Sequence, residues 1–563
     1  MHLAPCGARR VIGGLSHGLR LLARTKAYAC IHTLPQSSFT MGDSGNSSQP
    51  KYVPLWQSLK KWPKIVAYNL ALSSAILLYG YDFVIVGTVS AMPAFQHKYG
   101  EELDGQFIIP ATWLALWNAA SLIGWMIGAI IGGYFQDRAG RRRALALGSF
   151  FSAVAVAICF VSDLPDAIES RRGTFFAGKL FQGVCIGMLL CVVQTYMSEV
   201  LPVLLRGPII AFLPVFTLLG QLIGAVVVYT SLKYPGSESY RICFGSQWPF
   251  SAVPFVLAFV LPESPTWLVR KGRMEKALKA QKRLDTAGVN SEAIVEEIKL
   301  SILAEEEEGG TYTYMDCFRG IHARRTLIVA FASALPQFFG LQLLANASYF
   351  AEQVGMSSTN ALTFLILGIA LGLVANIVSL WALNALGRRF LSFSTMTTAT
   401  VLWFAMGIAG CFASVVTIWY TAVTMMIVTV VCGLGIWPAS HVVAAETSSL
   451  RLRAKTQGIG WFVSGITSGV FSVILPYIYN ADQGDLKAKT GFVMAGFAFL
   501  GVIGVWLFIP EMKGRSPMEI DRMFALQLPT RAFKHWESDV VMEKNVVDQR
   551  PPGNYAECAS ENA

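Results

Sequence analysis

Long apolar runs alternate with short polar segments along most of the chain. Each run holds enough mostly apolar residues to approach the roughly 20 that an α-helix needs to cross about 30 Å of hydrocarbon. The pattern therefore predicts an all-α integral membrane protein. We expect twelve spans, at residues 66–92, 111–134, 144–161, 174–197, 208–231, 244–261, 326–350, 361–384, 391–411, 418–445, 457–479 and 491–510.

The connection at 262–325 differs from the others because it is rich in charge. It holds 11 Lys and Arg and 11 Asp and Glu. We expect short surface helices there, joining two halves of six spans, and we expect the acidic run 305–308 to be a solvated face; a metal site is the alternative. The predicted parts are a disordered N-terminal segment 1–63, a bundle 64–261, the linker 262–325, a bundle 326–512 and a tail 513–563.

The composition supports the prediction of a membrane protein. Apolar residues make up 54% of the chain, charged residues 14%, and mean hydropathy is +0.49, whereas soluble domains carry about 25% charged residues. These values exclude a disordered or nucleic-acid-coating protein and argue against a soluble enzyme. The ten Cys form no CxxC motif or Cys/His cluster, so we expect no metal, no cofactor and no disulfide framework.

The net charge of +10 fits a membrane protein, because cytoplasmic loops collect Lys and Arg. The loops at 138–143, 388–389 and 451–455 are basic, which predicts that both termini and the linker are cytoplasmic. Residues 1–42 contain five basic residues and no acid. This segment resembles a mitochondrial transit peptide; the alternative, which we favour, is that Met41 is the true start.

The two halves repeat each other. The segment Gly132–Arg142 has a counterpart at 384–389, and the halves close on Pro262-Glu263 and on Pro510-Glu511. The spacing from Glu199 to Arg206 equals that from Glu446 to Arg453. Matched features in two halves are typical of transporters built from repeats.

These motifs identify a family resemblance. GGxxxDRxGRR, PESPxWL and PExKGR, in this order, resemble the sugar porters of the major facilitator superfamily over about residues 60–525. Gly178-Lys179, Tyr314–Gly320 and Leu452–Thr456 are similar to the fungal α-glucoside branch. The resemblance implies two pseudo-symmetric six-helix bundles that work by alternating access.

Charges at the predicted cytoplasmic helix ends are candidates for gating, because ion pairs between the halves could form in one state and break in the other. Binding of the arginines to anionic headgroups is the alternative, but it does not explain the two matched glutamates. The resemblance implies gating for Asp137, Arg138, Arg142, Glu199, Arg206, Arg388, Glu446 and Arg453.

Asp82 lies well inside the first predicted span, where an isolated carboxylate costs about 2.5–3.5 kcal/mol. Lys179 in the fourth span is its nearest candidate partner in depth. A carboxylate that alternates between a proton and an ammonium partner could couple proton entry to transport, and the resemblance agrees. A static buried ion pair is the alternative.

Amides and aromatic side chains at membrane depth are candidates for sugar binding, because sugars need groups that donate and accept hydrogen bonds and an aromatic face. Hydrogen bonds between helices are the alternative for each amide. The candidates are Gln221, Gln337, Gln342, Asn346, Asn376, Trp437 and His441.

Several residues depart from the sugar porter pattern. Pro214 and Pro336 replace glutamines, Trp437 replaces a glycine, Asn384 replaces an aspartate, and 457–479 contains no Asn. Such a pocket suits a disaccharide, a glycoside or another small polar metabolite. We therefore predict a monomeric plasma-membrane proton symporter for a sugar, either an α-glucoside or a hexose. The alternatives are a transporter of a non-sugar metabolite and a non-transporting sugar sensor; the sequence shows no site that would favour an enzyme.

Overall fold

The computed structural model describes residues 60–534 and residue 536, apart from 104, 203–204, 206–208, 210–211, 287–288, 310–312, 413, 450–451, 516. The described residues belong to one compact unit, Leu55–Ala563. The predicted N-terminal segment 1–63 lies outside the described residues except for its last four positions, and so does most of the predicted tail.

Helices build the first half of the chain. Its long helices are α3 (Pro63–Ser90), α5 (Ala111–Ala139), α6 (Arg141–Phe160), α7 (Ile168–Val200), α9 (Leu213–Ser231) and α11 (Trp248–Val260). The shorter elements are α4 (Pro93–Tyr99), β1 (Glu101–Leu103), β2 (Gln106–Ile108) and α10 (Glu238–Gly245). The two strands pair antiparallel, with Glu102 opposite Phe107.

The linker contains the short helices that its charge pattern predicts. They are α12 (Pro265–Arg270), α13 (Met274–Leu284), α14 (Ser291–Gly309) and the 3₁₀ turn η1 (Tyr314–Phe318). The backbone N–H of Thr313 donates to the Asp316 carboxylate at 2.6 Å and caps η1. This hydrogen bond holds the pKa of Asp316 below its ordinary value.

The second half repeats the pattern of long helices. They are α15 (Gly320–Phe338), α16 (Leu341–Ala345), α17 (Ala347–Gln353), α18 (Ser358–Leu386), α19 (Arg388–Ala409), α20 (Val415–Leu434), α21 (Ile436–Thr447), α22 (Arg453–Tyr479) and α23 (Thr490–Phe508). The short elements η2 (Lys487–Lys489), α24 (Pro517–Ala525) and η3 (Ala532–Lys534) complete it.

Eleven helical stretches of the described chain are long and apolar enough to cross a membrane. They correspond to all the predicted spans but the seventh, 326–350, which is broken into α15, α16 and α17. Gly340 causes the first break, because its φ of +97° is left-handed, a conformation that favours glycine. Asn346 separates α16 from α17. The seventh span is thus a broken helix and not a continuous one.

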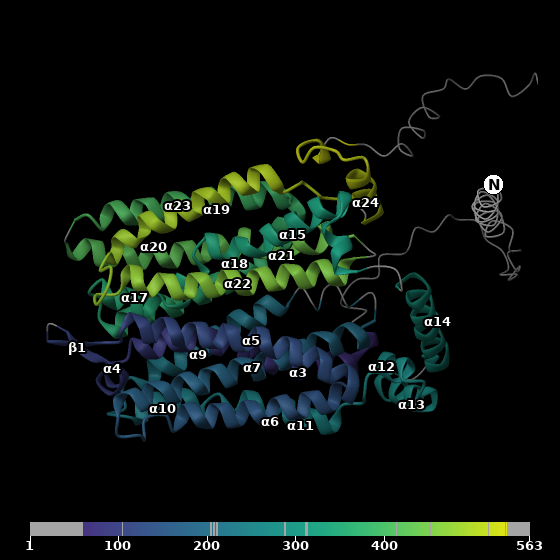
Figure 1. The fold of residues 1–563 in the computed structure, drawn as a ribbon, viewed down its shortest axis with the longest axis horizontal. Helices are drawn as coiled ribbons and strands as arrows, with labels where there is room; N and C mark the ends of the chain where they lie inside the picture. Colours follow the sequence, from purple (N-terminus) through teal and green to yellow (C-terminus); the bar gives the residue numbers. More distant parts are fainter. Residues whose placement is uncertain are drawn as a thin grey trace, which may run out of the picture. The chain divides into compact units, whose positions relative to one another are not determined.

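Small residues allow close helix packing within the halves. A Cβ at Gly128 of α5 would lie 2.0 Å from the carbonyl oxygen of Val184 in α7. Between the halves, α5 packs on α22 and α9 packs on α18. In Figure 1 the first-half helices, purple to blue, run alongside the green to yellow second half. Helices α12 to α14 mark one end of the helices, the linker end, and β1 with α4 marks the other, the hairpin end.

Candidate functional site

Asp82 of α3 and Lys179 of α7 form an ion pair inside the first half. Their side chains are 6% and 1% exposed, so water scarcely reaches either charge. Gly178 lets α7 approach α6, because a Cβ there would lie 2.7 Å from the Sγ atom of Cys159. Either charge would be costly here without the other. The structure brings the two predicted coupling residues together, while their role in coupling stays a prediction.

Asp82 also lines a pocket whose walls come from both halves. The lining residues are Tyr79, Asp82, Phe83, Val86, Asn118, Ser121, Leu122, Trp125, Gly183, Ile186 and Gln342. Of these, sequence reasoning singled out only Asp82 and Gln342. Asn118 and Ser121 were not predicted, although the sequence indicates them. They are polar residues three positions apart, on one helical face, inside the second predicted span.

The predicted amides of the seventh span have different surroundings, because that span is broken. Gln342 lines the pocket, and its buried Nε2 has no hydrogen-bond partner. Gln337 donates to the Oγ of Ser468 at 2.6 Å. Asn346 donates to the carbonyl oxygen of Gln342 at 3.0 Å and accepts from Asn118 of the first half at 3.3 Å. Among the three predicted amides, Gln342 is therefore the one on the pocket wall.

The other predicted binding residues do not line this pocket. Gln221 is buried in α9. Asn376 of α18 donates to a carbonyl oxygen of α20 at 3.5 Å, which is a bond between helices. Trp437 packs against the hydrophobic core. His441 is exposed, and its ring lies 5.9 Å from that of Trp461 in α22.

Two arginines occupy matching positions at the linker end. The guanidinium of Arg141 donates to both carboxylate oxygens of Glu199, at 3.0 and 2.8 Å. Arg388 makes the same paired contact with Glu446, at 3.2 and 2.8 Å. The prediction named Arg142 in place of Arg141. Arg142 instead donates to carbonyl oxygens of α11.

The N-termini of α6 and α19 are capped in the same way. Glu263 accepts hydrogen bonds from the backbone N–H groups of Arg141 and Arg142, and Glu511 accepts them from Arg388 and its neighbour at 389. A carboxylate at a helix N-terminus satisfies free N–H groups and complements the helix dipole. The repeat seen in the sequence is therefore a repeat of contacts.

The remaining predicted gating residues make fewer polar contacts. Asp137 lies 3.2 Å from the guanidinium of Arg141. Arg138 lies over a tyrosine ring of its own helix, 5.0 Å from the ring centroid. Arg453 is exposed at the start of α22, and Arg206 lies outside the described residues. The Arg–Glu pairs described above each join helices of one half, so the contacts between halves expected of gating are not among them.

Polar contacts between the halves gather at the hairpin end. Gln96 donates to the carboxylate of Glu352 at 2.8 Å, and Ser348 donates to the carbonyl oxygen of Gly87 at 3.1 Å. Asn480 donates to the carbonyl oxygen of Ile109 at 2.8 Å. These bonds close the molecule at that end.

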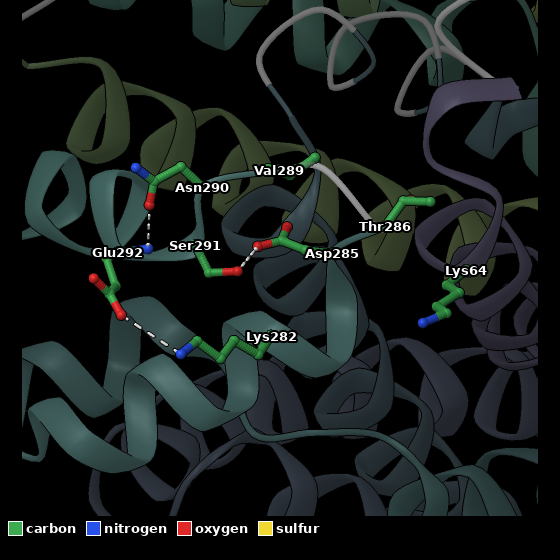
Figure 2. Close-up of a pocket in the computed structure, with 8 residues that line it drawn as sticks. All are labelled: Lys64, Lys282, Asp285, Thr286, Val289, Asn290, Ser291 and Glu292. Atoms are coloured by element: carbon green, nitrogen blue, oxygen red, sulfur yellow. Dashed lines mark hydrogen bonds and ion pairs between the residues drawn. The ribbon is translucent and has the colours of Figure 1, made fainter.

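A further pocket lies at the linker end, beside α3, α13 and α14, and Figure 2 shows its lining. Lys282 lies 3.5 Å from Glu292, and Ser291 donates to Asp285 at 2.6 Å. The pocket contains none of the predicted site residues, and these polar groups satisfy one another. We therefore place the functional site in the pocket beside Asp82.

Comparison with known proteins matches residues 68–524 to the family model "Sugar (and other) transporter". Maltose permease MAL61 of Saccharomyces cerevisiae is 31% identical over 497 residues, covering 86% of this chain and 80% of the permease. Alpha-glucosides permease MPH3 of the same species is 31% identical over 508 residues, covering 88% and 83%. The xylose transporter XylE of E. coli, in a partially occluded inward-open conformation, has the same fold, with a TM-score of 0.66, 20% identity and coverage of 81% and 100%.

Proposed function

The chain belongs to the sugar (and other) transporter family, and from that premise we propose that it carries a sugar across the plasma membrane together with protons. Its similarity to maltose and α-glucoside permeases favours an α-glucoside over a hexose. The protein is a multi-pass membrane transporter and not an enzyme. Both termini and the linker face the cytoplasm, and the working unit is a monomer.

The Asp82–Lys179 pair in the pocket wall carries the proposal. A protonated Asp82 would lose most of its attraction for Lys179, so proton binding would rearrange the wall that faces the substrate. A carboxylate is the group that proton pathways in membranes commonly use. Substrate and proton would thus act on the same few side chains.

The contacts at the hairpin end support alternating access. With the linker end in the cytoplasm, this conformation is closed toward the outside. The opposite state would have to open the hairpin end and bring the halves together at the linker end. The predicted gating residues stand at that end, where they would meet helix ends of the other half.

Uptake of labelled maltose, trehalose and glucose into transporter-null yeast tests the proposal. We expect uptake of maltose or trehalose that a protonophore abolishes. No uptake of any of the three, or of methyl α-glucoside, by a correctly localised protein would overturn the sugar assignment and favour a non-sugar substrate or a sensor. Uptake that the protonophore does not reduce would contradict proton coupling and leave the sugar assignment standing.

A further inference from the structure

Five aromatic rings form a continuous row that starts in the pocket. The ring of Tyr79 lies 6.2 Å from that of Phe83 and stacks on Trp125 at 6.5 Å. Trp125 meets Trp461 at 6.1 Å, and Trp461 meets His441 at 5.9 Å. We call these five residues the aromatic row. Because α3 and α5 belong to the first half and α21 and α22 to the second, the row crosses between the halves.

The row runs from the pocket toward the linker end, because Glu446, which follows His441 in α21, pairs with Arg388 at that end. Its outer rings are uncovered, whereas Tyr79, Phe83 and Trp125 are partly buried. Trp461 is 46% exposed and His441 is also exposed, whereas Trp117 and Trp403 are fully buried. Ring faces that are held in place but uncovered are suited to stacking with a ligand.

Hydrogen-bonding groups are available at the pocket end of the row. The Nε2 of Gln342 and the Oγ of Ser121 are buried without a partner, and the Gln342 side chain is only 4% exposed. Both residues line the pocket beside Asn118. An unpaired buried donor is costly, so a ligand that accepts from Gln342 would be favoured here.

Polar side chains next to the other end of the row already make hydrogen bonds within the protein. Ser440, next to His441, donates to a backbone carbonyl at 2.7 Å. Gln457, one turn before Trp461, donates to a backbone carbonyl at 2.6 Å and to Ser448 at 3.0 Å. Beside the ring faces, the hydrogen-bonding groups that this end offers are the imidazole nitrogens of His441 and the indole N–H of Trp461.

The charges beside the pocket cancel, because Asp82 and Lys179 pair with each other. We propose that the ligand is a neutral glycoside with an aromatic aglycone. Its sugar lies against Gln342, Ser121 and Asn118, and its aromatic ring stacks on the row as far as Trp461. This inference rests on the proposed function, since it specifies the substrate of the same site.

Competition for uptake of labelled methyl α-glucoside tests the inference in yeast that express the full chain. The competitors are phenyl α-glucoside, unlabelled methyl α-glucoside and maltotriose. We expect phenyl α-glucoside to inhibit at a concentration about tenfold lower than either of the others, as one well-placed aromatic contact allows. Trp461→Leu should abolish that preference and leave the affinity for methyl α-glucoside unchanged. Trp461→Phe should restore most of the preference.

The matched control is Trp381→Leu, which removes an indole that is 69% exposed on α18, outside the row, and should leave the preference intact. If Trp461→Leu fails to reach the membrane, the more conservative Trp461→Met should show the same selective loss. Uptake of methyl α-glucoside without preference for the phenyl compound would overturn the inference and leave the proposed function standing. An equal, Trp461-dependent preference for maltotriose would also overturn it. A localised wild-type protein that takes up no α-glucoside would overturn the proposed function itself.

Discussion

The ammonium of Lys179 meets the carboxylate of Asp82 in a buried ion pair on the wall of the pocket that also presents Gln342. A second pair, Asp163 with Arg241 at 2.9 Å, has a similarly buried carboxylate but does not line that pocket. The two carboxylates thus share their chemistry and differ in location. This difference allows proton coupling to be separated from stability.

Asp82→Asn should abolish accumulation of substrate against its gradient. The amide keeps the shape of the side chain but cannot take up or release a proton, so transport should become purely equilibrating. Exchange of labelled for unlabelled substrate across the membrane should persist. The measurements are the steady-state accumulation ratio and counterflow in proteoliposomes.

Asp163→Asn is the matched control for Asp82→Asn. It leaves Arg241 without its carboxylate, at a cost of about 1–3 kcal/mol before solvent screening of the partly exposed guanidinium. Stability should therefore fall, while protonophore-sensitive accumulation persists. Undiminished uphill uptake by Asp82→Asn would contradict the assigned role.

Arg141→Lys should lower thermal stability, because an ammonium cannot reproduce the two-pronged contact with Glu199. Loss of one charge-assisted hydrogen bond in a buried setting costs about 1.5–3 kcal/mol. Arg388→Lys should lower the melting temperature by less than Arg141→Lys, since Arg388 is 12% exposed and Arg141 is 3% exposed. Melting in detergent, with exposed Arg143→Lys as control, checks the order; a reversed order would count against the explanation.

Gly140→Ala should destabilise the protein for two reasons. Its φ of +98° and ψ of 161° lie in a region essentially confined to glycine, which costs a residue with a Cβ about 1–3 kcal/mol. The new Cβ would also lie 2.5 Å from the Glu263 carboxylate that caps α6. Gly272→Ala separates the two effects, because Gly272 has a φ of +70° and nothing within 4 Å. Equal losses of melting temperature would show that the contact with Glu263 does not matter.

Gln342→Ala should raise KM for the transported sugar by about tenfold, because a hydrogen bond is typically worth about 1 kcal/mol and more when a buried group is left unpaired. Gln221→Ala should leave KM nearly unchanged, since Gln221 does not line the pocket. Initial uptake rates across a range of concentrations measure both. A larger effect at Gln221 would move the site away from the pocket that we assign.

The sequence predicted the spans well, because hydropathy depends on local composition alone. It also singled out Asp82, since a charge inside a span is costly enough to need a reason. It missed Tyr79 and Trp125, because aromatic side chains inside a span are common and need no special reason. Whether such a ring faces lipid or a pocket depends on tertiary packing.

Two other misses have the same origin. Arg141 and Arg142 are adjacent, and successive helical residues point about 100° apart, so the choice between them needs the rotation of α6. The break of the seventh span at Gly340 was not predicted either. Glycines are frequent in the predicted spans, and only the φ of +97° distinguishes this one.

Gly87→Val should block closure of the hairpin end. A Cβ at Gly87 would lie 2.6 Å from the Cα of Asn346 and 2.8 Å from the carbonyl oxygen of Ala345. Both are backbone atoms, which cannot turn aside as a flexible side chain would. Valine should therefore hold α3 away from α16 and α17 and favour the state that is open at this end. Net uptake should fall by about tenfold or more if even 1.4 kcal/mol of this strain acts on the closed state.

A cysteine at position 348 can report the opening. Ser348 is buried and donates to the carbonyl oxygen of Gly87, so Ser348→Cys should resist a membrane-impermeant maleimide applied from outside. In the Gly87→Val background the same cysteine should be labelled. Gly87→Val chains that keep Ser348 give the background labelling of the other cysteines. Gly496→Val is the matched control, because a Cβ there has no atom within 4 Å, and it should preserve both protection and uptake. Wild-type uptake with a protected cysteine in Gly87→Val would mean that the contact at Gly87 does not control closure.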